Sequence, residues 1–331
     1  MAHSLLYMLR YVVFDLTLSE YRQAQVKDAH VAATATFSVP IEKITSTIAK
    51  PTGHKVVIAS DAARNSDHST KEAPMSFLKH LLAVCALITT VGTAHAEKIT
   101  IAAAADLKFA MDDIVTTFKK ANPADEVDVT YGSSGKFHTQ IQQGAPYDLF
   151  FSADIGFPRE LAKSGFAASD VKPYAVGRIV LWSNSLDASK MTLAGLSDPK
   201  ITRVAIANPK HAPYGKRAEE ALRAAGLWEK VEPKLVYGEN IAHTAQFVQT
   251  GNAQVGILAL SLAINPELAG KGGYALIPDS LHAPLEQGFV ITKRAAGSAL
   301  AKRFADYMGS KTARAVMAKY GFVLPGDVVS K

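Results

Sequence analysis

Short apolar segments alternate with helical patterns along residues 97–331, and this alternation restricts the possible folds more than any other feature of the chain. The first unit is an apolar run at 98–104. It is followed by apolar side chains at helical spacing: Leu107, Met111, Ile114, Val115 and Phe118. Further strand and helix patterns follow in turn to the end of the chain. Strands that alternate with helices form sheets covered by helices on both faces, so this part of the chain is predicted to have an α/β fold.

Two lobes account for these elements. The predicted strands are 98–104, 127–131, 148–152, 178–183, 203–207, 234–237, 255–259 and 288–292. The predicted helices start at Asp106, near Phe137, at Tyr214 and at Ile241, and a closing helix spans 298–318. We therefore predict a two-lobed architecture with mixed, mainly parallel sheets and a cleft between the lobes. In this prediction residues 97–178 and 283–331 form the first lobe, and residues 179–282 form the second.

The segment 75–96 has the pattern of a secretory signal peptide. It begins with Met75 and the basic residue Lys79, continues with an apolar run from 81 to 91, and ends in Ala94-His95-Ala96, which fits a cleavage site of the small-x-small type. The apolar run is too short for a permanent membrane span. We expect cleavage after Ala96 and a periplasmic location. A buried helix is the alternative for this segment.

Residues 1–74 precede this predicted signal peptide, although such a peptide normally stands at the N-terminus. They show no repeat and no sustained periodicity. We expect Met75 to be the true start and 1–74 to be an over-extended reading frame, with an N-terminal domain as the alternative. The remaining residues, 97–331, carry 27 basic and 23 acidic side chains. This mild positive excess suits a soluble protein that binds anions, and the absence of a concentrated basic stripe argues against nucleic-acid binding.

Small hydrogen-bonding residues gather where predicted strands give way to helices. The run Gly132-Ser133-Ser134-Gly135 offers two hydroxyl groups and, at a helix start, backbone N–H groups that can bind an anion. Helix capping with a tight turn is an equally good interpretation of this motif. Similar junctions lie at 208–215 and 238–241. Ligands of open α/β sheets bind beyond the carboxyl ends of the strands, so several helix starts converging there could hold a small dianion.

At these junctions the sequence resembles a known family. The stretches that carry the resemblance are 99–107 (ITIAAAADL), 131–135 (YGSSG), 144–154 (GAPYDLFFSAD), 208–215 (NPKHAPYG), 238–242 (GENIA) and 319–322 (KYGF). Residues 97–328 resemble the periplasmic molybdate-binding proteins of ABC importers, which are class II solute-binding proteins. The resemblance implies a hinged fold that holds molybdate, and usually tungstate, by neutral hydrogen bonds and delivers it to a membrane permease powered by a separate ATPase. We therefore expect a monomer with no enzymatic activity and no cofactor.

The resemblance also implies which residues hold the oxyanion. It assigns a hydroxyl ligand to Ser134, with Ser133 beside it, a backbone donor to Ile241, and the donor of the 208–215 junction to Tyr214. Two positions depart from the family pattern. Asp106 stands after the alanine run where a serine is common, and Ala259 stands where a tyrosine is common after a Gly-Ile strand.

Asp106 needs an explanation because a carboxylate repels an oxyanion. Our preferred interpretation is an N-cap, in which the side chain accepts hydrogen bonds from the helix that starts at Leu107 while the N–H groups of Ala105 and Asp106 face the ligand. In the same arrangement Lys108 or Lys136 is the candidate to neutralise the carboxylate. A protonated Asp106 that donates to the oxyanion is the alternative. An ionised Asp106 in the cleft would instead favour a protonated oxyanion such as phosphate.

Other functions were weighed against this one. A different oxyanion, phosphate or sulfate, is the alternative ligand. A serine hydrolase could use Ser134 with His138, His211 or His243, but Gly132-Ser-Ser-Gly135 spaces its glycines three apart and the nucleophile elbow needs four. The histidines of this part of the chain show no paired spacing on a helix, so we expect no cation site.

Overall fold

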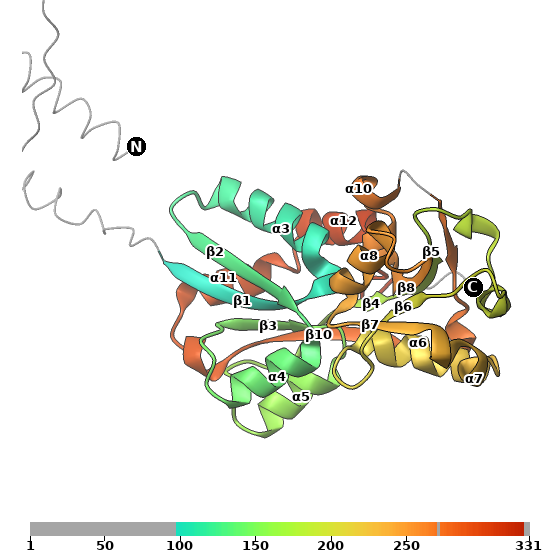
Figure 1. The fold of residues 1–331 in the computed structure, drawn as a ribbon. Helices are drawn as coiled ribbons and strands as arrows, with labels where there is room; N and C mark the ends of the chain where they lie inside the picture. The colour runs from blue at the N-terminus through green and yellow to red at the C-terminus, as the bar shows by residue number, and fades with distance from the viewer. Residues whose placement is uncertain (1–96, 270–271, 328–331) are drawn as a thin grey trace, which may run out of the picture. The chain divides into compact units, whose positions relative to one another are not determined.

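The structure is a computed structural model that describes residues 97–269 and 272–327, and these residues form two lobes, each built on a five-stranded sheet (Figure 1). The predicted signal peptide at 75–96 and the segment 1–74 lie outside the described residues. The two lobes are parts of one compact unit of the chain.

The sheet of the first lobe has the strand order β2-β1-β3-β10-β4. Its strands are β1 (Lys98–Ala104), β2 (Glu126–Gly132), β3 (Leu149–Ser152), β4 (Lys172–Gly177) and β10 (Leu285–Ile291). Its helices are the 3₁₀ turns η2 (Ala105–Leu107) and η7 (Lys293–Ala295) with α3 (Lys108–Ala121), α4 (Ser134–Gln142), α5 (Gly156–Lys163), α11 (Ala299–Tyr307) and α12 (Lys311–Lys319). Helix α3 lies on one side of the sheet, and α4 and α5 lie on the other (Figure 1).

The sheet of the second lobe has the order β7-β6-β8-β5-β9. Its strands are β5 (Ile179–Trp182), β6 (Val204–Ala207), β7 (Leu235–Gly238), β8 (Val255–Ala259) and β9 (Tyr274–Leu276). Its helices are α6 (Pro213–Ala224), α7 (Trp228–Val231), α8 (Ile241–Gln249), α9 (Leu260–Ala263) and α10 (Pro266–Ala269), with the 3₁₀ turns η3 (Ala188–Lys190), η4 (Leu193–Ser197), η5 (Glu232–Lys234) and η6 (Asp279–Leu281).

The chain crosses between the lobes twice. It leaves the first sheet at the end of β4 and enters the second at Ile179. It returns after β9 to form β10, which lies between β3 and β4 and runs antiparallel to both. Strand β5 likewise runs antiparallel to β8 and β9, whereas the pairs of β1 with β2 and β3 and of β6 with β7 and β8 are parallel. The prediction of mixed sheets is therefore confirmed, with antiparallel pairing more frequent than we expected.

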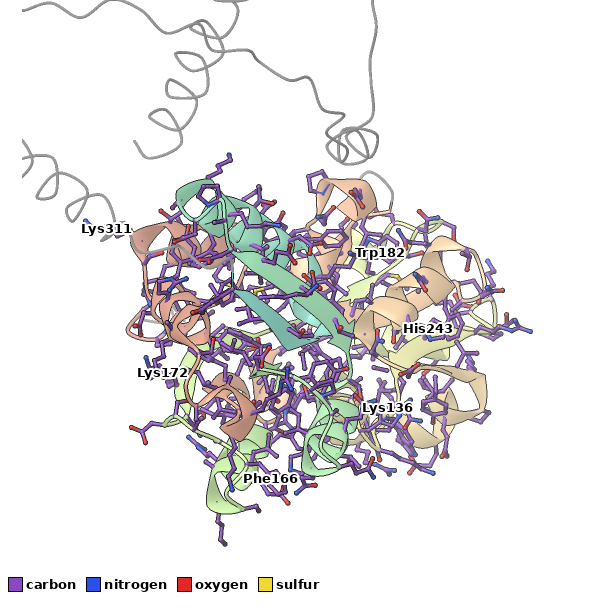
Figure 2. The ribbon with its side chains drawn as sticks, turned by 90° about the vertical axis from the view of Figure 1, so that its left-hand side faces the viewer. Lys136, Phe166, Lys172, Trp182, His243 and Lys311 are labelled. Carbon is purple, nitrogen blue, oxygen red and sulfur yellow. The ribbon has the colours of Figure 1, made fainter. Side chains whose placement is uncertain are left out.

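The cores follow from the alternation of side chains along the strands. In β1, Ile99 and Ile101 pack with α3, α11 and α12, while Ala102, the residue after Ile101, faces the other side of the sheet and packs against α4 and α5. In the second lobe Trp182 of β5 is buried in a separate core (Figure 2). That second core also includes Ala105 and Ala153 from the first lobe, so apolar packing continues across the line where the lobes meet.

Several elements differ from the predictions. The predicted closing helix at 298–318 is two helices, because the chain turns after Tyr307 and Ser310 starts α12 as an N-cap that accepts from the N–H of Ala313 at 3.1 Å. Helix α5 and strands β4 and β9 were not predicted. Among the described residues no helix is both long enough and apolar enough to span a membrane.

Candidate functional site

All six predicted site residues lie around one cavity where the two lobes meet. The cavity has a volume of about 10 Å³. Its walls contain the predicted residues Ala105, Asp106, Ser133, Ser134, Tyr214 and Ile241, together with Ala104, Gly132, Ala153, Ala212, Pro213 and Asn240. A volume of this size accommodates about one water-sized group. The structure therefore brings the three strand-to-helix junctions together at one cavity.

Three helices start at this cavity because the sequence places a helix-starting residue at each junction. Ser133 is the N-cap of α4 and accepts from the N–H of Lys136 at 3.4 Å. Asn240 is the N-cap of α8 and accepts from the N–H of His243 at 3.0 Å. Pro213 occupies the first turn of α6, where its missing N–H is not needed. The first turn of a helix has N–H groups without intrahelical partners, and they favour negative charge.

Gly215 allows α6 to start close to the end of β6. A Cβ atom at this position would collide with the carbonyl group of Ala207, the last residue of that strand. This close approach brings Tyr214, the residue before it, into the wall of the cavity. The glycine in the 208–215 motif therefore has a direct structural reason.

Ser134 is fully buried and holds its hydroxyl in a defined direction. Its Oγ accepts a hydrogen bond of 3.0 Å from the N–H of Ala153. A serine hydroxyl has one proton to donate in addition to the lone pairs with which it accepts. One lone pair of the Ser134 hydroxyl accepts from the N–H of Ala153, and the hydroxyl proton can be directed to a ligand in the cavity. Ser134 is therefore arranged as a hydrogen-bond donor.

Ser133 and its neighbour Gly135 connect the two lobes. The Oγ of Ser133 lies 2.9 Å from Nδ1 of His211, which belongs to the second lobe. The N–H of Gly135 donates to the carbonyl oxygen of His211 at 2.9 Å. Lys136 extends the contact with an ion pair of 3.0 Å to Glu239 of the second lobe. The start of α4 thus meets the second lobe through three polar contacts, made by Ser133, Gly135 and Lys136.

The predicted N-cap role of Asp106 is wrong. The chain enters a 3₁₀ turn at Ala105, so Asp106 lies inside the first turn and not before it, and neither η2 nor α3 has a side-chain cap. The carboxylate Oδ2 accepts instead from Nε2 of Gln287 at 2.7 Å and from the phenol of Tyr214 at 3.0 Å. The backbone oxygen of Asp106 accepts from Ser261 Oγ at 2.8 Å. Asp106 therefore binds the second lobe through both its side chain and its backbone.

Burial dominates the electrostatics of the Asp106 carboxyl group. It raises the pKa of Asp106 to about 6, although the hydrogen bonds from Gln287 and Tyr214 and, more weakly, the backbone N–H groups of Asp106 and Leu107 act in the opposite direction. Burial together with the neighbouring Asp106 charge also holds the pKa of Tyr214 well above 10, so the phenol stays protonated and can donate. When Asp106 is ionised, the phenol proton lies on the hydrogen bond to the carboxylate.

The two lysines that were considered as partners of Asp106 lie elsewhere. Lys108 pairs with Asp112 at 3.4 Å, and Lys136 pairs with Glu239. Among residues 97–269 and 272–327, no lysine, arginine or histidine lines the cavity. An anion held here would be bound by neutral donors and helix starts.

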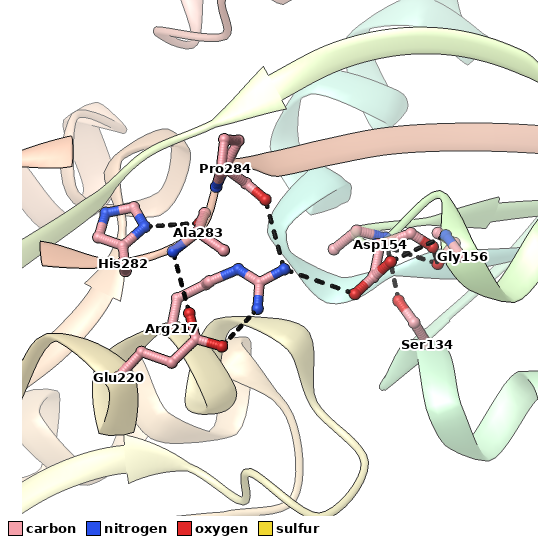
Figure 3. Close-up of polar contacts among 10 residues, drawn as sticks. Ser134, Asp154, Gly156, Arg217, Glu220, His282, Ala283 and Pro284 are labelled. Atoms are coloured by element: carbon pink, nitrogen blue, oxygen red, sulfur yellow. Dashed lines mark hydrogen bonds and ion pairs between the residues drawn. The ribbon is translucent and has the colours of Figure 1, made fainter. Parts of the chain in front are cut away.

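A buried arginine joins the lobes beside the cavity. Arg217 of α6 pairs with Glu220 at 2.9 Å and with Asp154 of the first lobe at 3.6 Å, and it donates to the carbonyl oxygen of Pro284 at 3.3 Å (Figure 3). Asp154 follows Ala153, whose N–H is bound by Ser134. The same short loop of the first lobe therefore contacts both the cavity and Arg217.

The geometry does not support a hydrolase. A serine–histidine pair exists, but it joins His211 to Ser133, whose Oγ also caps α4. Among the described residues no carboxylate is hydrogen-bonded to His211, so the third member of a triad is missing. The described part of the chain also has no cluster of three or more histidine, cysteine, aspartate or glutamate residues that could hold a metal ion.

The sequence did not point to Gln287, Ser261 and His211 as parts of this arrangement. A signal existed for Gln287, because it is a polar residue inside the apolar strand β10 and is fully buried. Ser261 lies in a short helix with no distinguishing pattern. The sequence raised His211 only as a partner of a catalytic serine or as a candidate metal ligand, and not as a contact between the lobes.

Comparison with known proteins identifies the family. The profile described as "Bacterial extracellular solute-binding protein" matches residues 99–323. The chain is 40% identical to the molybdate-binding protein ModA of Rhodobacter capsulatus over 200 residues, which cover 60% of this chain and 77% of that protein. It is 36% identical to ModA of Azotobacter vinelandii over 233 residues, covering 70% of this chain and 92% of that protein.

Solved structures agree with this assignment. The periplasmic molybdate-binding protein of Azotobacter vinelandii superimposes with a TM-score of 0.65 at 30% identity, over 69% of this chain and 99% of that one. The chain belongs to the bacterial extracellular solute-binding proteins. Within that family its relatives of 36–40% identity are named molybdate-binding proteins, which confirms the resemblance found in the sequence.

Proposed function

We propose that the protein captures molybdate, and also tungstate, in the periplasm and delivers it to an ABC importer made of a membrane permease and a separate ATPase. Ser134, the phenol or backbone N–H of Tyr214 and the backbone N–H of Ile241 hold the oxyanion, with Ser133 and the N–H groups of Ala105 and Asp106 beside them. The protein acts as a monomer and needs no cofactor.

One observation carries this proposal. The starts of α4, α6 and α8 and the hydroxyl of Ser134 converge on a single cavity whose described walls contain no cationic side chain. Molybdate, a fully deprotonated tetrahedral oxyanion, has only acceptor atoms, so a ring of neutral donors satisfies it from all sides. The names of the relatives support molybdate as the particular oxyanion.

Capture requires the lobes to separate. The cavity of about 10 Å³ is closed by polar contacts that cross between the lobes, among them the bond from Gly135 to His211 and the bond from Tyr214 to Asp106. An oxyanion enters only when these contacts open. Once bound, it replaces some of the hydrogen bonds that hold the lobes together. Hinge closure of this kind needs flexible connections, and the chain crosses between the sheets at only two places.

Isothermal titration of the purified protein with molybdate, tungstate, sulfate and phosphate at pH 7.5 tests the proposal. We expect one-to-one binding of molybdate and tungstate, and no heat from sulfate or phosphate. Binding of sulfate or phosphate with a silent molybdate titration would contradict the ligand assignment. Steady turnover of ester substrates that is lost in Ser133→Ala would contradict a pure binding role.

Phosphate is the second candidate ligand because Asp106 lies in the wall of the cavity. An ionised carboxylate could accept a hydrogen bond from a protonated phosphate, whereas molybdate offers it no proton. The same titration decides between the two ligands. A protonated phosphate needs an ionised Asp106 that accepts its proton in a hydrogen bond, whereas molybdate needs an Asp106 without that negative charge.

A further inference from the structure

Asp106 presents one carboxylate oxygen that the protein itself does not satisfy. The residue is 1% exposed, and its Oδ2 is bound by Gln287 and Tyr214. Its Oδ1 is buried and has no hydrogen-bond partner. Asp106 is also one of the residues that line the oxyanion cavity. Buried polar atoms almost always have a hydrogen-bond partner, so we expect Oδ1 to gain one when the ligand binds.

We propose that the site takes up one proton with each oxyanion and holds that proton on Asp106, whose carboxyl group then donates a hydrogen bond to the anion. This inference rests on the function proposed above. The proton comes from solvent and forms an O–H bond at Oδ1 as the anion binds. The same proton returns to solvent when the anion leaves, so no other reactant is needed.

Charge repulsion makes this uptake favourable. An ionised Asp106 next to a dianion would place two like charges together in a buried space, where water screens them poorly. None of the ion pairs in residues 97–269 and 272–327 includes Asp106, so no cation offsets the repulsion. Protonation removes the carboxylate charge and converts an oxygen that can only accept into a donor.

The hydrogen bonds around Asp106 fit a proton on Oδ1. Oδ2 accepts from both Gln287 and Tyr214, so it is the oxygen that keeps its lone pairs. Gln287 also donates to the phenol oxygen at 3.1 Å, which fixes the phenol proton toward Asp106. Burial, with these hydrogen bonds opposing it, raises the pKa of Asp106 to about 6. The proton is thus available near neutral pH, and a bound dianion raises the pKa further.

Other titratable groups near Asp106 do not supply this proton. Tyr214 of α6 and Tyr174 of β4 face it, and burial holds the pKa of both phenols well above 10. From β10 and α9 the facing polar groups, Gln287 and Ser261, do not titrate.

The charged groups on the remaining neighbouring elements are directed elsewhere. Lys108 of α3 pairs with Asp112, and Arg217 of α6 pairs with Asp154 and Glu220. His243 of α8 accepts from the N–H of Glu239.

The polar groups of β2 are also paired with other residues. The phenol of Tyr131 donates to Asp112, and Asp128 pairs with Lys98. The imidazole of His211 is hydrogen-bonded to Ser133. Burial and, to a smaller extent, the charge of Lys136 lower the pKa of this imidazole.

The test counts protons. Molybdate is titrated calorimetrically into the purified protein at pH 6, 7 and 8, each in two buffers of different ionisation enthalpy. The difference in heat gives the number of protons taken up per anion. For the wild-type protein we expect about one proton at pH 8 and about half a proton at pH 6, with the Kd weakening about tenfold per pH unit above pH 7.

Asp106→Asn is the matched variant, because its side-chain amide has the same shape and donates a hydrogen bond at every pH. It retains His211 and all other titrating groups. We expect its proton count to be near zero and its Kd to be constant between pH 6 and 8. At pH 8 it should bind molybdate more tightly than the wild type.

The outcomes separate the two proposals. Tight molybdate binding by the wild type with no proton uptake and a constant Kd overturns the role of Asp106 and leaves the proposed function intact. Loss of binding in Asp106→Asn with an unchanged circular dichroism spectrum and melting temperature also overturns it, because an ionised carboxylate is then required. Absence of molybdate binding at every pH, with binding of phosphate, overturns both. The proton count of the wild type decides the matter even when the variant does not fold.

Discussion

Replacing Gly135 by alanine should hinder closure of the two lobes without harming either of them. The glycine lies in the first turn of α4, and its N–H donates to the carbonyl oxygen of His211 across the lobes at 2.9 Å. A Cβ atom at Gly135 would lie 2.7 Å from that oxygen and 3.1 Å from the Cα atom of His211. Carbon atoms normally stay about 3.5 Å or more from such neighbours, so the lobes must separate by roughly 0.5–1 Å at this point.

The cost follows from what that separation breaks. A shift of this size stretches the bond from Gly135 to His211 from 2.9 Å to about 3.4–3.9 Å, which weakens or breaks it and costs about 1 kcal/mol. It also moves the donors on α4 away from those on α6 and α8. We expect a total of about 2 kcal/mol, which weakens molybdate binding by roughly 30-fold. Alanine is a better helix former than glycine, so the melting temperature of the ligand-free protein should stay constant or rise slightly.

The assay is isothermal titration of Gly135→Ala with molybdate, combined with thermal unfolding without ligand. Gly297→Ala is the matched control, since a Cβ atom there meets nothing within 4 Å and its backbone is not in the left-handed region. The control should bind like the wild type. An affinity of Gly135→Ala within twofold of the wild type would refute the reasoning, because closure would then not use this contact.

Three further predictions follow from single contacts. Ser134→Ala removes the buried hydroxyl and leaves the N–H of Ala153 unpaired, so molybdate binding should weaken by about 2 kcal/mol in calorimetry; an unchanged Kd would exclude Ser134 as a ligand. Burial raises the folded-state pKa of Asp106 to about 6, above the ordinary value of 3.8, so the contribution of Asp106 to stability is full below pH 4 and is lost as pH rises through 6. In urea unfolding, Asp106→Asn should therefore be more stable than the wild type by up to about 3 kcal/mol at pH 7.5 and equally stable at pH 4. Equal stability of the two proteins at both pH values would contradict the raised pKa. Arg217→Met breaks the contact with Asp154 and should lower the free energy of unfolding by about 2 kcal/mol, whereas no change would show that this ion pair adds nothing.

Hydrophobic periodicity was enough to predict most of the strands and helices. The run 98–104 is strand β1 with the same bounds, and the predicted start of α8 at Ile241 is also correct. The short strands β4 and β9 were missed because β4 contains a proline and a glycine and β9 has only three residues. Antiparallel pairing of β10 was not predictable from local pattern, since it depends on the return of the chain from the other lobe.

The candidate site could be predicted because helix starts have local sequence signals. Ser133, Pro213 and Asn240 mark the three junctions, and each lies in the wall of the cavity. The surroundings of Asp106 could not be predicted, because its partners Gln287 and Tyr214 are more than 100 positions away in the chain. An aspartate before a helical pattern usually is an N-cap, and here the tertiary contacts with the second lobe replaced that role.

Crystals grown with molybdate, measured by anomalous diffraction at the molybdenum edge, test the central claim most directly. The account predicts one anomalous peak between the lobes, with oxyanion oxygens within hydrogen-bonding distance of Ser134 Oγ and of the backbone N–H of Ile241. A peak at the groove lined by Lys210, Lys216 and Arg223, or on any other cationic surface, with no peak between the lobes, would contradict it.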